Sequence, residues 1–138
     1  MVQANPEARA RFSWPARVYY EDTDAGGVVY YANYLKFFER ARTEWLRSFG
    51  LNQDKLAQEQ SLIFVVRRAA LDFVKPARLD DLLEITVEPL KLARVYVELA
   101  QEARRGAQLL ARAEVQVACV NQRSFKPAAI PQCIRDKL

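Results

Sequence analysis

The chain has 138 residues, of which 51% are hydrophobic and 28% charged, as expected for one globular domain and not for a disordered chain. Its net charge of +4 comes from 21 basic and 17 acidic residues that are spread along the sequence, so no nucleic-acid-binding stripe is indicated. The absence of histidine excludes Ser-His-Asp triads, Cys-His dyads and histidine-ligated metals. Any acid–base chemistry must therefore use Asp, Glu, Tyr, Lys or Cys side chains.

Cysteine content and hydropathy indicate the cellular compartment in which the protein is expected. The two cysteines, Cys119 and Cys133, are too few for a disulfide framework or a cysteine-only metal site. No run of about 18 apolar residues occurs, and the first residues lack the apolar core of a signal peptide. We expect a reduced, cytoplasmic protein without metal, cofactor or integral membrane segment. We also expect a single domain over residues 1–138, with residues 1–12 as a flexible N-terminal extension.

The first predicted strand runs from Trp14 to Tyr20 and leads directly into an acidic block that ends at Tyr34. A carboxylate group, a bare glycine backbone and a helix start are together what an acyl-transfer or hydrolysis site needs. The alternative is a strand-to-helix loop in which Asp and Gly are only turn residues. The block places three carboxylates within four positions and then a pair of glycines, namely Glu21, Asp22, Asp24, Gly26 and Gly27.

The conformation of the block decides which carboxylates are neighbours. In an extended chain, alternation would place Asp22 and Asp24 on one side and Glu21 on the other. The alternative for Asp22 is a structural one, as the cap of a turn or helix.

A long helix with a wide buried face is predicted to follow, because apolar residues recur at spacings of four, three, four and four. Asn33 can cap its start, and Gly50 can end it as a C′ residue. The apolar positions are Tyr34, Phe38, Ala41, Trp45 and Phe49, broadened by Leu35, Phe37 and Leu46; the charged residues Glu39, Arg40, Arg42 and Glu44 fall on the remaining side.

The rest of the chain is predicted to be mostly strands. After a loop and a short polar helix over residues 51–60, apolar and polar residues alternate in four segments. These lie around residues 69–73, 83–88, 95–105 and 111–119, and a short tail helix is predicted over residues 134–138. One apolar helix and five one-sided strands predict an α+β fold in which a curved antiparallel five-stranded sheet wraps around the helix. Long exposed strand edges also predict a homodimer.

The block from Tyr19 to Tyr34, the segment Phe38–Glu44 and the later segment Pro76–Asp81 resemble a known family. They are similar to the hotdog-fold acyl-CoA thioesterases of the 4-hydroxybenzoyl-CoA thioesterase type, closest to the branch encoded with the Tol-Pal envelope system of proteobacteria. The resemblance extends from about Trp14 to the C-terminal segment. It implies dimers with a continuous sheet, often assembled as homotetramers. It also implies hydrolysis of acyl-CoA thioesters without a metal or an organic cofactor.

The resemblance makes Asp24 the catalytic residue. A carboxylate can attack the thioester carbonyl or deprotonate a water molecule, and both routes remain open. Backbone N–H groups are the expected oxyanion donors. The resemblance places such a donor at residues 63–65, before the second strand, so that Val65 and the bare backbone of Gly27 would contact the substrate.

Tyr31 marks a departure, because the Tol-Pal branch usually has His at this position, whereas the hydroxybenzoyl prototype has Tyr. Its hydroxyl could bind the substrate, or its ring could form an aromatic wall at a dimer interface. Three functions remain: an acyl-CoA thioesterase, an acyl-carrier-protein thioesterase, and a catalytically weak acyl-binding or scaffold protein. Candidate ligands for the CoA phosphates are Arg67, Arg68, Arg123 and Lys126.

Overall fold

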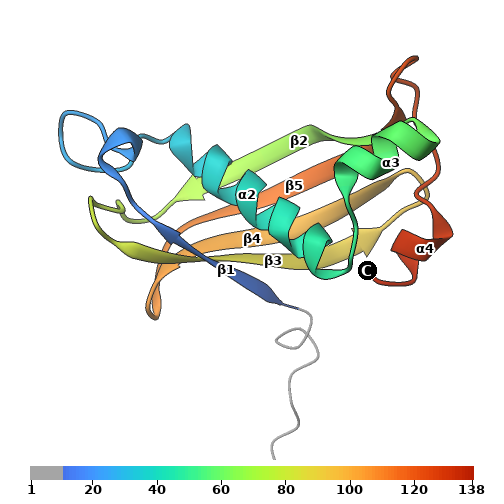
Figure 1. The fold of residues 1–138 in the computed structure, drawn as a ribbon. Coiled ribbons are helices and arrows are strands. Elements are labelled where there is room, and N and C mark those ends of the chain that lie inside the picture. Colours follow the sequence, from blue (N-terminus) through green and yellow to red (C-terminus); the bar gives the residue numbers. More distant parts are fainter. Residues whose placement is uncertain (1–10) are drawn as a thin grey trace, which may run out of the picture.

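The computed structural model describes residues 11–138, in which a five-stranded antiparallel sheet is crossed on its inner face by one long helix (Figure 1). This is the predicted α+β hotdog arrangement. The strands are β1 (Phe12–Arg17), β2 (Leu62–Phe73), β3 (Leu82–Leu92), β4 (Tyr96–Arg105) and β5 (Gln108–Asn121), in the order β1-β3-β4-β5-β2. The helices are α2 (Asn33–Ser48), α3 (Gln53–Gln60) and α4 (Gln132–Arg135), and a 3₁₀ turn, η1, spans Tyr20–Asp22.

Helix α2 buries the apolar face that its periodicity predicts. Phe38 and Ala41 are fully buried, and Gly50 ends the helix with a φ of 82°. The Gly50 N–H donates to the Arg47 carbonyl at 2.9 Å, and the Leu51 N–H donates to the Leu46 carbonyl at 3.2 Å. This pair of hydrogen bonds closes the last turn as a Schellman motif.

Three details of the predicted helix are wrong. Leu35 is 47% exposed and does not broaden the buried face. Asn33 is the first residue of α2 and makes no cap, because its side chain binds Asp22 instead. Arg42 is half-buried beneath the helix and not on the solvent side, because its guanidinium binds Gln101 of β4.

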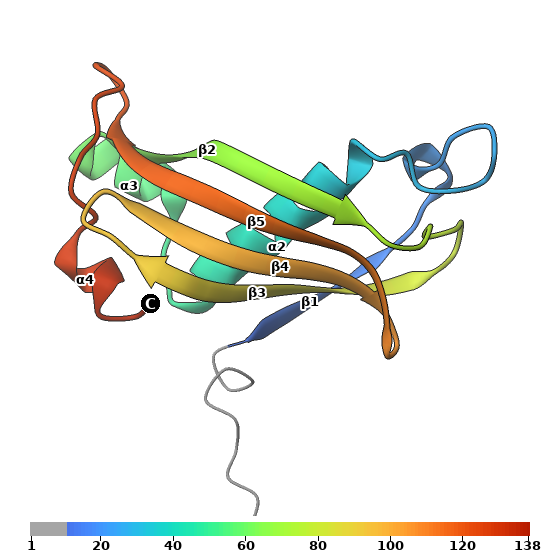
Figure 2. The ribbon, with the colours of Figure 1, turned by 180° about the vertical axis from the view of Figure 1, so that it is seen from behind.

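The inner face of the sheet supplies the rest of the core. Leu83, Ile85 and Val87 of β3 are fully buried, as their alternation predicts. In β4 and β5 the same alternation buries Val97 and Leu99 beside Val115 and Val117, while the intervening residues form the outer face seen in Figure 2. The core therefore lies between α2 and the inner face.

Several predicted boundaries differ from the structure. Strand β1 ends at Arg17, so Tyr19 and Tyr20 have left the strand and enter η1. Strand β2 begins at Leu62, well before the predicted alternation. The prediction missed this start because the first residues of the strand are apolar on both faces and show no alternation. The tail helix is α4, which ends before residues 136–138. The predicted extension over residues 1–12 lies outside the described residues except for Arg11 and Phe12, and Phe12 begins β1.

The elements divide between two ends of the molecule (Figure 1). The acidic loop (residues 19–30) and the connection over residues 74–81 lie beside the start of α2 and the end of β2, whereas α3 and α4 lie at the opposite end. Strand β2 pairs with β5 alone within residues 11–138, so its other edge is open. No helix in this range is long and apolar enough to cross a membrane.

Candidate active site

Asp22 organises the inner half of the acidic loop. It is only 6% exposed, and both carboxylate oxygens are hydrogen-bonded. Oδ2 accepts the Tyr19 N–H at 2.8 Å, and Oδ1 accepts the Asn33 Nδ2 amide at 2.8 Å. A buried carboxylate requires such donors. Asp22 is therefore the turn cap that was one of its two predicted roles, and it ties the loop to the first turn of α2.

Asp24 lies in the exposed outer half of the same loop. Its Oδ1 atom accepts the Gly26 N–H at 2.8 Å, and within residues 11–138 its Oδ2 atom has no hydrogen-bond partner. The prediction that Asp22 and Asp24 share one side of an extended chain is wrong, because residues 20–22 coil into η1. The chain thus separates a structural carboxylate from an accessible one two residues later.

The glycine pair closes a tight turn after Asp24. Gly27 has a φ of 76°, a conformation that favours glycine, and its N–H donates to the Asp24 carbonyl at 3.0 Å. The Asp24 N–H in turn donates to the Val28 carbonyl at 2.9 Å. Asp24 is therefore held by main-chain hydrogen bonds on both sides, which fix the position from which its carboxylate extends.

Residues 77–81 brace the acidic loop from outside. The Val29 N–H donates to the Ala77 carbonyl at 2.8 Å, and Val28 forms a bridge with Arg78. Asp81 Oδ2 accepts the Arg78 N–H at 2.9 Å and the Arg105 Nη1 at 2.6 Å. Partial burial works to raise the pKa of Asp81, but these hydrogen bonds and the charges of the two arginines outweigh it and lower the pKa below its ordinary value.

An aromatic cluster joins the start of α2 to the end of β2. The Tyr31 ring is 4.8 Å from that of Tyr30 and 6.3 Å, edge-on, from that of Phe73. Tyr34 lies 5.5 Å from Phe73, and its hydroxyl accepts the Ala77 N–H at 3.1 Å. Burial raises the pKa of Tyr34. Tyr34 is a buried core residue, whereas Tyr31 is 62% exposed and available to a ligand.

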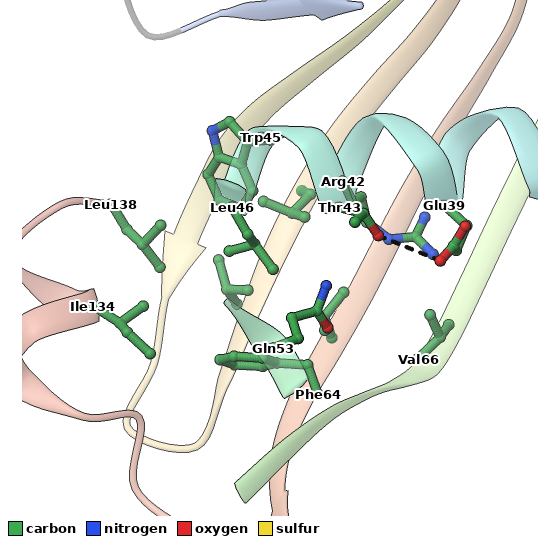
Figure 3. Close-up of a pocket in the computed structure, with 13 residues that line it drawn as sticks. Glu39, Arg42, Thr43, Trp45, Leu46, Gln53, Phe64, Val66, Ile134 and Leu138 are labelled. Atoms are coloured by element: carbon green, nitrogen blue, oxygen red, sulfur yellow. Dashed lines mark hydrogen bonds between the residues drawn. The ribbon is translucent and has the colours of Figure 1, made fainter. Parts of the chain in front are cut away.

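A groove of about 530 Å³ leads away from this cluster between α2 and β2. Its walls are mainly apolar, and Lys36, Glu39 and Arg42 contribute the polar part. A second cavity, of about 130 Å³, continues under the C-terminal half of α2. Figure 3 shows it with Glu39 and Arg42 at one end and Ile134 and Leu138 at the other. Glu39, Arg42 and Val66 line both spaces.

Val65 is not brought to the acidic loop of the same chain. It lies within β2, opposite Ala118 of β5, and not before the strand as predicted. Eight residues separate it from Phe73, which places the two about 26 Å apart along a strand. Asp24, Gly27 and Tyr31 therefore gather at one end of the molecule, and Val65 lies toward the other.

The residues predicted for phosphate binding do not form one cluster. The Arg67 Nε donates to Gln116 at 2.7 Å, and its guanidinium lies 4.8 Å above the Tyr96 ring on the outer face of the sheet. Arg123 and Lys126 lie in the turn after β5. Within the described part of the chain, no group of three acidic or cysteine side chains could hold a metal ion.

Sequence reasoning missed the polar pair formed by the half-buried Arg42 and the buried Gln101. Gln101 is fully buried, accepts from Arg42 Nη1 at 2.9 Å, and donates to the Phe38 carbonyl at 3.0 Å. Two signals could have revealed the pair. Arg42 follows Phe38 by four residues, so it falls on the buried side of α2. Gln101 continues the inward alternation of Val97 and Leu99.

A family model, the thioesterase-like superfamily, matches residues 18–138. The chain belongs to this superfamily. This thioesterase-like chain is 48% identical over 124 residues to the acyl-CoA thioesterase YbgC of Haemophilus influenzae, covering 90% of this chain and 91% of that protein. The resemblance to hotdog thioesterases is thereby confirmed.

Solved structures agree with the fold. A probable thioesterase from Bartonella henselae superposes with a TM-score of 0.85 at 40% identity, covering 88% of this chain and 100% of that one. A 1,4-dihydroxy-2-naphthoyl-CoA thioesterase from Synechocystis superposes with a TM-score of 0.84 at 28% identity, and the match covers 91% of this chain and 93% of that one.

Proposed function

We propose that this thioesterase-like protein hydrolyses acyl-CoA thioesters and that Asp24 is its catalytic carboxylate. The observation that carries the proposal is the free Oδ2 atom of Asp24, exposed at the end of the molecule where the α2–β2 groove begins. The name of the YbgC relative, an acyl-CoA thioesterase, supports the same substrate class.

Asp24 has two chemically complete routes to the products. In one, Oδ2 attacks the thioester carbon and CoA leaves as a thiolate, so that an anhydride forms that water then hydrolyses. In the other, Oδ2 accepts a proton from a water molecule as that water attacks the same carbon. The thiolate is a good leaving group, so neither route needs a strong general acid.

The developing oxyanion needs N–H or O–H donors. The Gly26 and Gly27 N–H groups are already bonded to Asp24. Gly27 therefore serves the substrate through its lack of a side chain, since nothing lies within 4 Å of where a Cβ would be. The exposed hydroxyl of Tyr31 is one donor that can reach the carbonyl, and its ring offers a wall to the acyl group.

A second copy of the chain supplies the missing Val65. The open edge of β2 can pair with its own symmetry mate, and two such strands run antiparallel around a two-fold axis. The Leu62–Val65 end of one β2 then comes beside the Leu71–Phe73 end of the other. The pairing adds Val65 of the partner subunit to the Asp24 end and closes the open side of the groove. This homodimer is the assembly that we propose, and two dimers would make the predicted tetramer.

The test is thiol release from a panel of short, long and aromatic acyl-CoAs by the wild type and by Asp24→Asn. We expect turnover of at least one substrate and a loss of about 10²-fold or more in the variant. Asp54→Asn, which removes an exposed carboxylate in α3, is the matched control and should keep full activity. Acyl-CoA binding without turnover would favour an acyl-binding protein. Turnover of acyl-carrier-protein thioesters but not of acyl-CoAs would identify an acyl-carrier-protein thioesterase instead.

Labelled water separates the two routes. After turnover in H₂¹⁸O, label in the Asp24 carboxylate requires a covalent anhydride. Label confined to the released acid is expected for water activated by Asp24, and also for an anhydride that water opens at the acyl carbon, so trapping the acyl-enzyme with hydroxylamine distinguishes these two. Peptide mass spectrometry reads the first outcome and product mass spectrometry the second.

A further inference from the structure

The groove between α2 and β2 is lined on one side by helix residues and on the other by strand residues. Tyr31, just before α2, and Phe73, at the end of β2, lie with their rings 6.3 Å apart beside the acidic loop, next to the start of the groove. Leu35 and Leu71 line the groove next, and Arg42 and Val66 line it furthest from the loop. The other apolar lining residues are Phe38, Ala69 and Val115. The groove thus starts beside the proposed reacting carbon and runs along the helix.

Three charged side chains line the groove, and Arg42, the furthest of them from the acidic loop, is half-buried, whereas Lys36 and Glu39 are exposed. Among residues 11–138 the one hydrogen bond of the Arg42 guanidinium goes to Gln101. Gln101 is fixed in turn by the carbonyls of Phe38 and Thr86, at 3.0 and 3.3 Å. Burial lowers the pKa of Arg42, and the nearby Glu39 carboxylate partly opposes this shift. An apolar chain end that displaced the remaining water from the guanidinium would leave N–H donors unpaired.

The length of the path from the start of α2, beside the acidic loop, to Arg42 follows from helix geometry. Nine residues separate Asn33, at the start of α2, from Arg42, which corresponds to about 14 Å along the axis. An extended alkyl chain advances about 1.25 Å per carbon, so about ten to twelve carbons cover this distance. A longer chain must pass the Arg42–Gln101 pair to enter the inner cavity of about 130 Å³.

We propose that Arg42, held by Gln101, sets the upper limit of acyl-chain length at about ten to twelve carbons. The proposal rests on the proposed thioesterase function and names its substrate class as short- and medium-chain acyl groups. The limit is energetic and steric: the guanidinium both occupies the path and resists losing its water.

The experiment measures kcat/KM for saturated acyl-CoAs of increasing length, each below its micellar concentration. The wild type should rise in kcat/KM to about ten to twelve carbons and then fall. Arg42→Met keeps an unbranched stem of four side-chain atoms and removes the charge together with the end of the guanidinium group. Its optimum should move by at least two carbons, with the ratio of long- to medium-chain kcat/KM rising about 10-fold or more. Arg40→Met, an exposed arginine of the same helix, should keep the wild-type profile.

A second variant works in the opposite direction and does not depend on the folding of Arg42→Met. Ala69→Phe fills the groove before Arg42 and should abolish activity on ten-carbon chains while four-carbon chains still turn over. Circular dichroism and thermal melting verify that each variant is folded.

Three outcomes would overturn the proposal. A folded Arg42→Met with the wild-type length profile removes the role of Arg42. A wild-type profile that does not fall beyond twelve carbons removes the limit itself. A wild type that hydrolyses no acyl-CoA removes the proposed function and this inference with it, which distinguishes that failure from the first two.

Discussion

The two halves of the acidic loop use the same residue type for opposite purposes. In the inner half, Asp22 is buried and both its oxygens accept hydrogen bonds, from the Tyr19 N–H and from Asn33. In the outer half, Asp24 is exposed and one oxygen has no partner within the described chain. Two residues of separation thus distinguish a buried, structural carboxylate from an exposed one.

The difference shows how a stable support and an exposed group can coexist in a short loop. The inner half is anchored to α2 and, through Val29, to Ala77. In the outer half, the hydrogen bonds of Asp24 lie within its own turn, and within residues 11–138 its Oδ2 atom has no partner, so this oxygen remains free for a ligand. Changes in the inner half should therefore cost stability first, and changes in the outer half should cost activity first.

The largest expected effect on stability comes from Asn33→Asp. The new carboxylate would face Asp22 Oδ1 at the position of a 2.8 Å hydrogen bond, with both side chains buried. Like charges and a lost donor should cost about 3 kcal/mol of unfolding free energy. Urea unfolding measures it. Asn52→Asp is the control, because Asn52 caps α3 and Asp caps equally well.

Asp22→Asn and Asp24→Asn form a matched pair two residues apart. In Asp22→Asn, the new amide N–H₂ would face one of the two present donors, the Tyr19 N–H or the Asn33 amide, and that hydrogen bond would be lost. The free energy of unfolding should fall by about 2 kcal/mol. Asp24→Asn should change it by less than about 0.5 kcal/mol while activity falls as described above. Equal stability losses in the two variants would contradict the division of the loop.

Gly27→Ala tests the turn that presents Asp24. The Cβ itself meets no atom within 4 Å, so the cost comes from the φ of 76° and should be about 1 kcal/mol. Gly26→Ala has no positive φ but brings a Cβ to 3.2 Å from Asp24 Oδ1. It should therefore change activity more than it changes thermal stability. Thermal melting and thiol release on both variants separate the two effects.

The smallest loss of stability among these predicted losses is expected at Asp81, in the segment of residues 77–81 that contacts the acidic loop. Its pKa is lower in the folded than in the unfolded chain, where it is about 3.9. Its ion pair therefore stabilises the fold above about pH 4, and the stabilisation is lost as the pH falls through the lower, folded pKa. Asp81→Asn should cost about 0.5 kcal/mol near neutral pH and nothing in strong acid.

The control for this pH dependence is Asp80→Asn. Asp80 has a φ of 69°, which Asn tolerates as well as Asp. Asp80→Asn should therefore keep the wild-type stability near neutral pH. A constant deficit of Asp81→Asn down to pH values well below the folded pKa would show that its loss is not electrostatic.

Most of the architecture could be predicted because it depends on periodicity. The apolar recurrence over Tyr34–Phe49 and the alternation in Leu83–Val87 each repeat several times, so a single exception does not hide them. The failures occur where a few residues decide the outcome. Tyr19 and Tyr20 have strand-forming side chains but turn into η1, because Asp22 captures the Tyr19 N–H.

The candidate site was less predictable because its parts come from distant segments. The resemblance singled out Asp24, which remains a proposal. Only the folded chain shows that Tyr31 contacts Phe73, and that Arg42 lies beneath α2 against Gln101.

The sequence by itself determined the fold class, the buried face of α2 and the inward residues of the strands, because these follow from local periods of 3.6 and 2.0 residues. The tertiary structure alone decided which of the two carboxylates, Asp22 or Asp24, is buried. It also decided where the groove starts and where it ends. Those outcomes depend on contacts between segments 11 to 59 residues apart, such as Asp22 with Asn33 and Arg42 with Gln101. No local pattern encodes such pairings.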